Sequence, residues 1–398
     1  LKSLGSRSSQ FEDNSYILHV LSETGLSHTA QPLSSVQLIW ASSMSADDEG
    51  LIQTKDENVH DGSRMGAPEH PPLQTGFDRI VLERIDPKLF LAKPEHLWKP
   101  PGARAVFGGQ VLGQALSAAS QTVGPQLSLH SLHAYFVRPG QLEHPLLYDV
   151  KRIRDGSSFA TRAVGAKQNG QGILTMIASF HRREYASLDN QALMPSVPSP
   201  ETLPTEEQRW QNILSDPSMD PIVKQMLKQG MNAILRSRQQ SPFDLRFIVD
   251  HLNWSSEEAK QILAKNNFSS MGMPSQLMWF RARNRLPDDE HVHHAVVAYQ
   301  SDAGLLATAR VGVPPSTFNE ARPMMASLDH AMWFHQPFPS WRADEWLLYV
   351  MYSPRLSGAR GLAHGHIFTQ DGRLVVSCSQ EGLIRLGTDR DSPPASKL

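Results

Sequence analysis

The chain of 398 residues is longer than one hydrophobic core usually fills, so two domains are expected. Hydrophobic residues make up 40% and charged residues 20% of the chain, a balance that suits a globular protein and excludes disorder of the whole. The formal net charge of −2 provides no overall basic field, so nucleic acid is not an expected partner. Cys378 is the only cysteine, which excludes an internal disulfide and disfavours secretion.

The two ends of the chain carry different signals. Residues 1–75 are rich in Ser, Asp, Glu and Gly without a sustained period, which predicts a poorly ordered N-terminal extension. No apolar stretch approaches the length of about 18 residues that spans a bilayer, so no membrane span is expected. The tail over 389–398 ends in Ser396-Lys397-Leu398, the type of address that the peroxisomal import receptor reads. We therefore expect this receptor as a partner and the peroxisome matrix as the location, with an ordinary polar tail as the alternative.

Regular patterning starts near Phe77 and predicts a first domain over 76–185. Apolar residues recur at helical spacing over 110–123, which predicts a helix with one buried face. β-rich runs follow it, separated by Pro139-Gly140, Asp155-Gly156 and Asn169-Gly170. The predicted strands cover 129–137, 146–153, 158–166 and 173–181. One helix followed by an antiparallel meander is the expected architecture.

The same pattern returns in a second predicted domain over 241–388. A helix is expected over 295–310, and strands are expected over 326–334, 346–352, 361–369 and 374–386. Gly156 and Gly170 in the first half are separated by the same number of residues as Gly358 and Gly372 in the second, and each interval ends in a hairpin dipeptide. The second domain therefore looks like a duplicate of the first.

The segment between the two domains, 186–240, is predicted to be a Pro-rich and helical linker. Thr205 and Gln208 have the spacing of a capping box, which predicts a helix start. Ser255 and Glu258 have the same spacing and predict another helix, in an insertion near 251–274. We expect these helices to connect or to cover the two domains.

Several longer motifs lie within the two repeats. They are Phe107-Gly108-Gly109-Gln110-Val111-Leu112-Gly113-Gln114-Ala115, Phe136-Val137-Arg138-Pro139-Gly140, Tyr299-Gln300-Ser301-Asp302, Ser327-Leu328-Asp329-His330-Ala331-Met332-Trp333-Phe334-His335, Glu345-Trp346-Leu347-Leu348-Tyr349, Ala359-Arg360-Gly361 and Gln380-Glu381-Gly382-Leu383-Ile384-Arg385. With them the chain resembles the type II acyl-CoA thioesterases over about 76–204 and 275–386. The resemblance implies an α+β double hot-dog fold, in which two tandem repeats each wrap a curved antiparallel sheet around a central helix. It also implies hydrolysis of fatty acyl-CoA to free fatty acid and coenzyme A, without a cofactor.

The resemblance implies three catalytic residues. In that family they are an Asp on the second central helix, a Ser or Thr just before the Asp-His strand motif, and a Gln before Glu-Gly. The matching positions are Asp302, Ser327 and Gln380. These side chains would hold and activate a water molecule, and no covalent acyl-enzyme would form.

Asp302 also stands out by its position. On a helix over 295–310 it would share a face with apolar residues at spacings of three, four and seven, namely Ala295, Ala298, Tyr299, Leu305, Leu306 and Ala309. An unpaired buried charge costs roughly several kcal/mol, so we expect Asp302 to have hydrogen-bonding partners or a raised pKa. Ser327 and Gln380, on strands that cover the helix, are suitable partners. A structural buried Asp is the alternative, and Asp329 is the next carboxylate to consider because it alternates onto the strand face of Ser327.

Other hydrolytic nucleophiles have weaker support. A serine hydrolase would need a Gly-x-Ser-x-Gly elbow, which the sequence lacks. Cys378 alternates with Gln380 on a strand, but a single buried Cys is more often a small core residue than a nucleophile. Two functions other than hydrolysis stay open. One is a non-catalytic acyl-CoA-binding protein. The other is a hydratase or dehydratase, since hot-dog folds also host dehydratases that act on acyl thioesters.

Histidine and glycine clusters suggest other ligands. The histidines are His291, His293, His294, His364 and His366, and none has the ligand spacing of a known metal site, so no metal is expected. Gly108, Gly109 and Gly113 do not form a dinucleotide-binding fingerprint. They instead permit close backbone approach at a helix start, whose N–H groups are candidates to receive a phosphate or thioester oxygen.

The duplicated pattern also bears on assembly. Hot-dog sheets present edges and a broad outer face, and a two-domain chain can close one pair of domains internally. We expect a monomer that contains the paired domains, or a homodimer of it.

Overall fold

The structure is a computed structural model, and it describes residues 78–101, 103–184, 188–215, 241–250, 253–254, 256–268, 272–313 and 324–385. The predicted N-terminal extension over 1–75 and the tail over 389–398 lie outside these residues, as does the second half of the predicted linker. All of the described residues belong to one structural unit.

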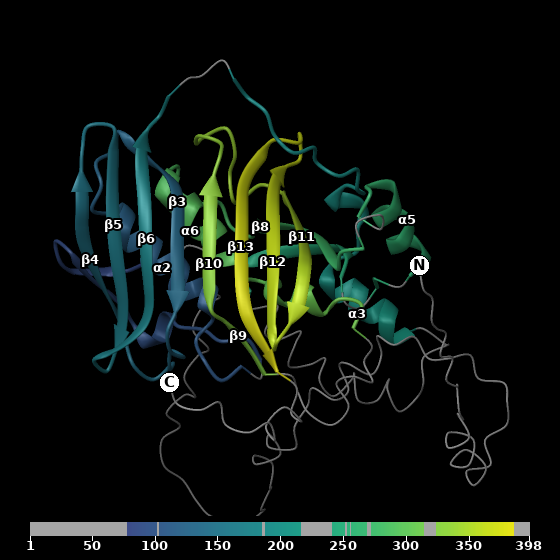
Figure 1. Cartoon of the computed structure of the whole chain (residues 1–398), viewed down its shortest axis with the longest axis horizontal. Coiled ribbons are helices and arrows are strands. Elements are labelled where there is room, and N and C mark those ends of the chain that lie inside the picture. Colours follow the sequence, from purple (N-terminus) through teal and green to yellow (C-terminus); the bar gives the residue numbers. More distant parts are fainter. Residues whose placement is uncertain are drawn as a thin grey trace, which may run out of the picture. The chain divides into compact units, whose positions relative to one another are not determined.

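A single antiparallel sheet dominates the described part of the chain (Figure 1). Its strand order is β1-β2-β4-β5-β6-β3-β10-β13-β12-β11-β8-β7, and β9 pairs with the end of β13. The first half contributes β1 (Glu83–Asp86), β2 (Leu89–Ala92), β3 (Leu127–Phe136), β4 (Leu146–Asp155), β5 (Phe159–Gln168) and β6 (Gln171–Arg182). The second half contributes β7 (Phe243–Val249), β8 (Ser275–Ala282), β9 (Met324–Ser327), β10 (Asp329–Phe334), β11 (Leu347–Ser357), β12 (Arg360–Thr369) and β13 (Leu374–Arg385). The two halves meet where β3 and β10 pair, with His330 opposite Ala134.

Two central helices lie behind this sheet, α2 (Gly108–Ser120) and α6 (Glu290–Ser301) (Figure 1). A Cβ on Gly109 would lie 2.2 Å from Tyr299 O, and one on Gly113 would lie 2.7 Å from Ala295 O. Only glycine permits this approach of the two backbones. Because the contact partners run in opposite order along the two helices, the N-terminus of α2 lies beside the C-terminus of α6.

The predicted central helix of the first half is confirmed, but its burial differs from the expectation. The sequence predicts one buried face, but nearly every residue of α2 is buried, including the polar Gln110 and Gln114. Tyr148 donates a hydrogen bond to Gln114 Oε1 at 2.6 Å, so the polar side chains on this helix are satisfied internally. The sheet covers one side of α2 and α6 covers the other, which explains why burial extends all round.

The predicted helix over 295–310 is wrong at both ends. Helix α6 starts earlier, at the N-cap Asp289, whose side chain accepts the N–H of His291. It ends at Ser301, and Gly304 adopts a φ of +86°, which turns the chain before the short helix η4 (Leu306–Arg310). Asp302 is therefore the C-cap of α6 and not part of a continuous apolar face.

The peripheral helices partly follow the capping predictions. Helix α3 (Glu206–Ser215) starts at the expected capping box, since Thr205 Oγ1 accepts the N–H of Gln208 and the Gln208 side chain accepts the N–H of Thr205. Helix α5 (Glu257–Lys265) is capped by Ser256, one residue later than predicted. Short helices are η2 (Pro94–His96) and η3 (Pro200–Thr202).

A second apolar cluster lies between β7, β8 and β11 on one side and α5 on the other. Its members include Val249, Leu277, Trp279, Leu348, Ile262 and Leu263. This cover buries both faces of β8, whose residues are almost all buried. None of the helices in the described ranges combines the length and the apolar character that crossing a bilayer requires.

Candidate active site

Asp302 is held at the junction of the two central helices. Its backbone N–H closes the last turn of α6 on Gln300 O. Its Oδ2 accepts the N–H of Gly109, at the start of α2, at 2.8 Å. Its Oδ1 accepts a hydrogen bond from Gln380 Nε2 at 2.5 Å and one from Ser327 Oγ at 3.5 Å. The structure therefore brings together the three side chains that the sequence motifs indicated.

Two neighbouring strands position the other members of this cluster. Ser327 ends β9 and lies opposite Gly382 of β13, while Gln380 lies on β13 opposite Ala363. Gln380 is fully buried, and its Nε2 also donates to Ser327 Oγ at 3.0 Å. Its Oε1 is buried and has no hydrogen-bonding partner among the described residues. The site thus presents a carboxylate, a hydroxyl and an unused amide oxygen within one small cluster.

The electrostatic environment of Asp302 has two opposing parts. Burial raises the pKa of the carboxylate, and the hydrogen bonds from Gln380, Gly109 and Ser327 oppose that rise. The negative end of the α6 dipole also disfavours the charge, whereas the positive end of α2 favours it. The net result is a raised pKa, the property that a general base for neutral solution requires.

The glycines at the start of α2 have a steric role. A Cβ on Gly108 would lie 3.0 Å from Asp302 Oδ2 and 3.1 Å from Phe136 Cε1. The expected close backbone approach is thus present at Gly109 and Gly113, against the backbone of α6, and Gly108 leaves room for the carboxylate. The N–H of Gly109 is bonded to Asp302, so it is not the receiver of a phosphate or thioester oxygen.

Cys378 lies close to this site but is not a nucleophile. The residue is buried, and burial raises the pKa of its thiol to about 12, so the sulfur stays protonated near neutral pH. Its Sγ lies 3.2 Å from Tyr349 Oη. This placement agrees with the prediction of a small core residue.

The interpretation of Asp329 as a carboxylate on the strand face of Ser327 is wrong. The strand is interrupted at Leu328, whose N–H donates to Glu381 O and whose carbonyl accepts the N–H of Phe136. After this break His330 is fully buried against α6, so the adjacent Asp329 points to the opposite face of β10. There it accepts the N–H of Glu381 at 2.8 Å.

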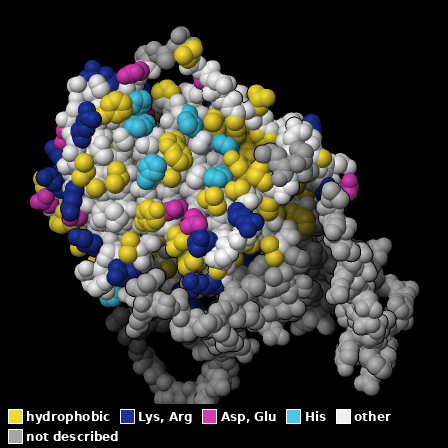
Figure 2. Space-filling view, viewed as in Figure 1, with side chains coloured by type: hydrophobic (Ala, Val, Ile, Leu, Met, Phe, Trp, Pro, Cys, Tyr) yellow, Lys and Arg dark blue, Asp and Glu magenta, His cyan; other side chains and the backbone are white. Residues whose placement is uncertain are grey.

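The histidines occupy two different environments. Figure 2 shows histidines among hydrophobic side chains over the face of the sheet away from the helices. His364 and His366 alternate with buried residues on β12 and pack beside Tyr352. His293 and His294 are buried in α6. Within the described ranges, no group of three or more His, Cys, Asp or Glu side chains could hold a metal ion.

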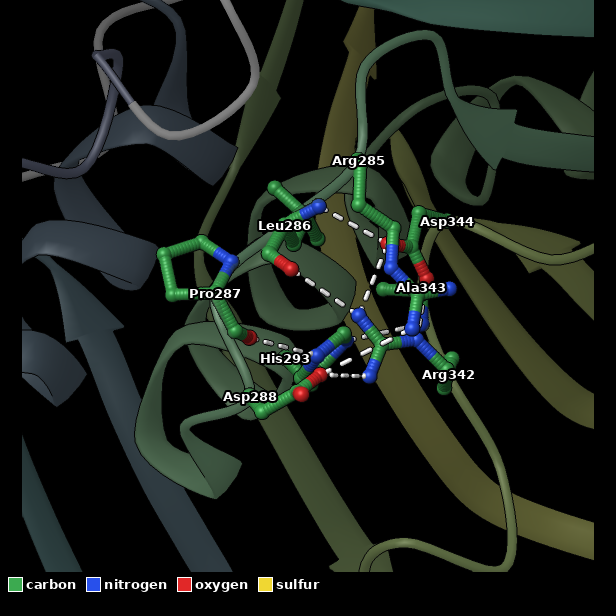
Figure 3. A network of polar contacts seen from close by, with 8 residues as sticks. All are labelled: Arg285, Leu286, Pro287, Asp288, His293, Arg342, Ala343 and Asp344. Atoms are coloured by element: carbon green, nitrogen blue, oxygen red, sulfur yellow. Dashed lines mark hydrogen bonds and ion pairs between the residues drawn. The ribbon is translucent and has the colours of Figure 1, made fainter.

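The far end of α6 is anchored by a polar network (Figure 3). Arg342 Nε donates to Asp344 Oδ1 at 2.8 Å, and its Nη2 donates to Leu286 O at 2.9 Å. Its Nη1 also bonds Asp288, one residue before the helix cap. His293 Nδ1 accepts the N–H of Ala343 at 3.0 Å. The loop before β11 thus fixes the helix that carries Asp302 at its other end.

The sequence motifs missed the backbone part of the site. The N–H of Gly109 comes from the other half of the chain, 193 positions from Asp302, and no periodicity links the two. The side chains behind the last turn of α6, Tyr349 and His330, were also not identified as contacts of that turn. Both residues lie in motifs that carry the family resemblance, and their place in these motifs is the signal that could have identified them.

A shared antiparallel sheet wrapped around two antiparallel helices, with a carboxylate at their junction, defines a double hot-dog protein. The solved structure of acyl-CoA thioesterase II TesB2 from Mycobacterium marinum has the same fold, with a TM-score of 0.59 and 33% identity, over 80% of this chain and 99% of that one. Residues 95–181 match the family model described as acyl-CoA thioesterase N-terminal domain, and residues 248–383 match the model described as acyl-CoA thioesterase.

Two curated relatives extend this match. Acyl-coenzyme A thioesterase 8 of Mus musculus is 40% identical over 308 residues, which are 77% of this chain and 88% of that protein. Peroxisomal acyl-coenzyme A thioester hydrolase 1 of Saccharomyces cerevisiae is 27% identical over 326 residues, which are 73% of this chain and 89% of that protein. The chain therefore belongs to the type II acyl-CoA thioesterase family.

Proposed function

We propose that this thioesterase hydrolyses fatty acyl-CoA with a water molecule that Asp302, Ser327 and Gln380 hold and activate. The observation that carries this proposal is the convergence of Gln380 Nε2 and Ser327 Oγ on Asp302 Oδ1, while Gly109 fixes Oδ2. Since both carboxylate oxygens are fixed, the base has a defined orientation. The unused Gln380 Oε1 can accept a hydrogen bond from the water, which orients the water oxygen.

The reaction follows from this arrangement. Asp302 takes a proton from the water as the water oxygen attacks the carbonyl carbon of the thioester. The negative charge that develops on the carbonyl oxygen faces the positive end of α2, where Gly108 is the candidate donor. Collapse of the tetrahedral intermediate breaks the carbon–sulfur bond, and the coenzyme A thiolate takes the proton from Asp302. No acyl group becomes attached to the protein, and no metal or cofactor enters a step.

The test is the turnover of Asp302→Asn with palmitoyl-CoA, measured as release of the free coenzyme A thiol. Positioned base catalysis contributes about 10² to 10⁴ in rate, so kcat should fall by about that factor while KM changes little. Ser327→Ala and Gln380→Ala should each lose less, and double variants should be strongly non-additive because all three residues act on one water.

Asp329→Asn is the matched control. This carboxylate lies 27 positions from Asp302, on the opposite face of the sheet from the site, so its loss should leave turnover unchanged. Near-normal turnover in Asp302→Asn would refute the assignment. Absence of thiol release by the unaltered protein would instead favour the non-catalytic binder, and hydration of an enoyl-CoA would favour the hydratase reading.

We further propose the peroxisome matrix as the location and the peroxisomal import receptor as a partner. The C-terminal Ser396-Lys397-Leu398 supports this, and the yeast relative is named as peroxisomal.

We also propose a monomer that contains the two paired hot-dog domains, over 76–185 and 241–388, or a homodimer of it. The pairing of β3 with β10 and the bond between Gly109 and Asp302 support it, because the site needs both halves. Separated halves that are each stable, active monomers would contradict it.

A further inference from the structure

The last turn of α6, directly before Asp302, is held from two sides. Tyr349 Oη donates a hydrogen bond to Ser301 O at 2.6 Å. The Ser301 hydroxyl donates to Ala298 O at 2.9 Å and lies 2.9 Å from His330 Nε2. Tyr349, Ser301 and His330 are all fully buried. The residue that precedes the catalytic carboxylate therefore has both its carbonyl and its side chain fixed.

The chemical state of the two neighbours is defined by their burial. Burial lowers the pKa of His330 to about 3, so the imidazole is neutral. The Ser301 hydroxyl has a single proton, which it donates to Ala298 O, so the Nε2 that lies 2.9 Å from the Ser301 oxygen is assigned as the donor of that contact. Burial also raises the pKa of Tyr349 well above its ordinary value, which keeps its hydroxyl a donor. Both groups thus act on Ser301 as neutral hydrogen-bond donors.

The neighbouring strands restrict the position of the Tyr349 ring. Tyr349 lies on β11, and a Cβ on Gly365 of the neighbouring β12 would lie 2.5 Å from its Cε2 and 3.1 Å from its Oη. Its hydroxyl also contacts Cys378 Sγ of β13 at 3.2 Å. Because a glycine makes the room for this ring, the hydroxyl has a fixed direction toward the end of α6.

This contact has two consequences for Asp302. The carbonyl groups of the last turn of a helix have no partner within the helix and carry partial negative charge. A donor on Ser301 O offsets part of that charge and holds the turn that sets the position of the next residue. Loss of the Tyr349 hydroxyl leaves the buried Ser301 carbonyl without a hydrogen-bond donor, next to the Asp302 carboxylate. It also loosens the helix turn that holds Asp302.

We propose that Tyr349 is a positioning residue for thioester hydrolysis, which fixes the C-terminal turn of α6 so that Asp302 faces Ser327 and Gln380. His330 supports the same turn through the Ser301 side chain. The inference rests on the proposed role of Asp302 as the base. Tyr349 does not touch the substrate in this account, and it acts only through the helix end.

The test compares Tyr349→Phe with Tyr148→Phe. Tyr148 is an equally buried tyrosine on β4, and its hydroxyl donates to Gln114 Oε1 at 2.6 Å, away from Asp302. Both variants lose one buried hydrogen bond and keep the ring. Tyr349→Phe should lower kcat for palmitoyl-CoA by about tenfold with little change in KM, because one hydrogen bond corresponds to about that factor. Its acid limb in the pH profile of kcat/KM should move to higher pH, since added negative potential favours protonated Asp302.

Tyr148→Phe should lower the melting temperature about as much as Tyr349→Phe does, because each variant loses one buried hydrogen bond. It should leave kcat and the acid limb of the pH profile unchanged. Equal kcat and equal pH profiles in the two variants would overturn the inference. Ser301→Ala loosens the same turn without touching the tyrosine, and it should reproduce the kcat loss if Tyr349→Phe does not fold. Normal turnover in Asp302→Asn would overturn the proposed function itself. A large loss in Asp302→Asn together with normal turnover in folded Tyr349→Phe would overturn only the role of Tyr349.

Discussion

Gly109→Ala is the sharpest perturbation that the helix contact offers. The new Cβ would lie 2.2 Å from Tyr299 O, a backbone atom that cannot rotate away. An ordinary contact needs about 1 Å more, so the start of α2 and the end of α6 must separate by about that distance. Such overpacking costs about 1–3 kcal/mol in stability. Because the N–H of Gly109 is bonded to Asp302, the same shift lengthens the bond that orients this carboxylate, the proposed base.

The expected effect on turnover follows from that displacement. A misplacement of about 1 Å at a catalytic group can lower the rate by about 10²-fold, so kcat of Gly109→Ala should fall by about that factor. Gly113→Ala is the matched control, because its Cβ would lie 2.7 Å from Ala295 O, one turn farther from the carboxylate. Thermal unfolding and thiol release from palmitoyl-CoA measure both variants. Folded Gly109→Ala with a kcat no lower than that of Gly113→Ala would refute the claim that the helix contact orients Asp302.

Two further outcomes are expected. Burial lowers the pKa of His330 to about 3 and that of His293 to about 4, whereas unfolded histidine titrates near 6.5. Their contribution to the free energy of unfolding is therefore complete above about pH 6.5 and is lost as the pH falls. Between pH 6.5 and pH 4 the loss is on the order of 3 kcal/mol for His330. Urea unfolding midpoints across that range measure it, and a flat profile would contradict the burial of neutral histidine. Deletion of Ser396-Lys397-Leu398 should leave the activity intact and move a tagged protein from peroxisomes to the cytosol. An unchanged location of the deletion protein would contradict the targeting proposal.

The repeat could be predicted from the sequence because it rests on local signals, and the resemblance to a known family indicated the three side chains that the fold brings together. The hairpin dipeptides at Asn169-Gly170 and Asp371-Gly372 end β5 and β12 as expected. The strands β4, β5, β6, β12 and β13 lie within a few residues of their predicted ranges.

Other features depend on tertiary packing and could not be predicted in this way. The apolar period continues through Leu305, Leu306 and Ala309 after α6 has ended, because η4 packs its own apolar side against the glycines of the sheet. Gly382, for example, faces Leu306 directly. Strand β8 shows no alternation because the second apolar cluster covers its outer face. The bond between Gly109 and Asp302 joins the two halves of the chain, and only the fold brings them together.

Direct attack of water on the thioester is the central claim, and a single turnover in ¹⁸O-labelled water tests it most directly. With enzyme in excess over palmitoyl-CoA, coenzyme A and fatty acid should be released at the same rate, and the fatty acid should carry one ¹⁸O. The peptide that contains Asp302 should have its unlabelled mass. A burst of coenzyme A ahead of fatty acid, or an acyl group or ¹⁸O on Asp302, would show a covalent intermediate and would contradict the role of Asp302 as a general base.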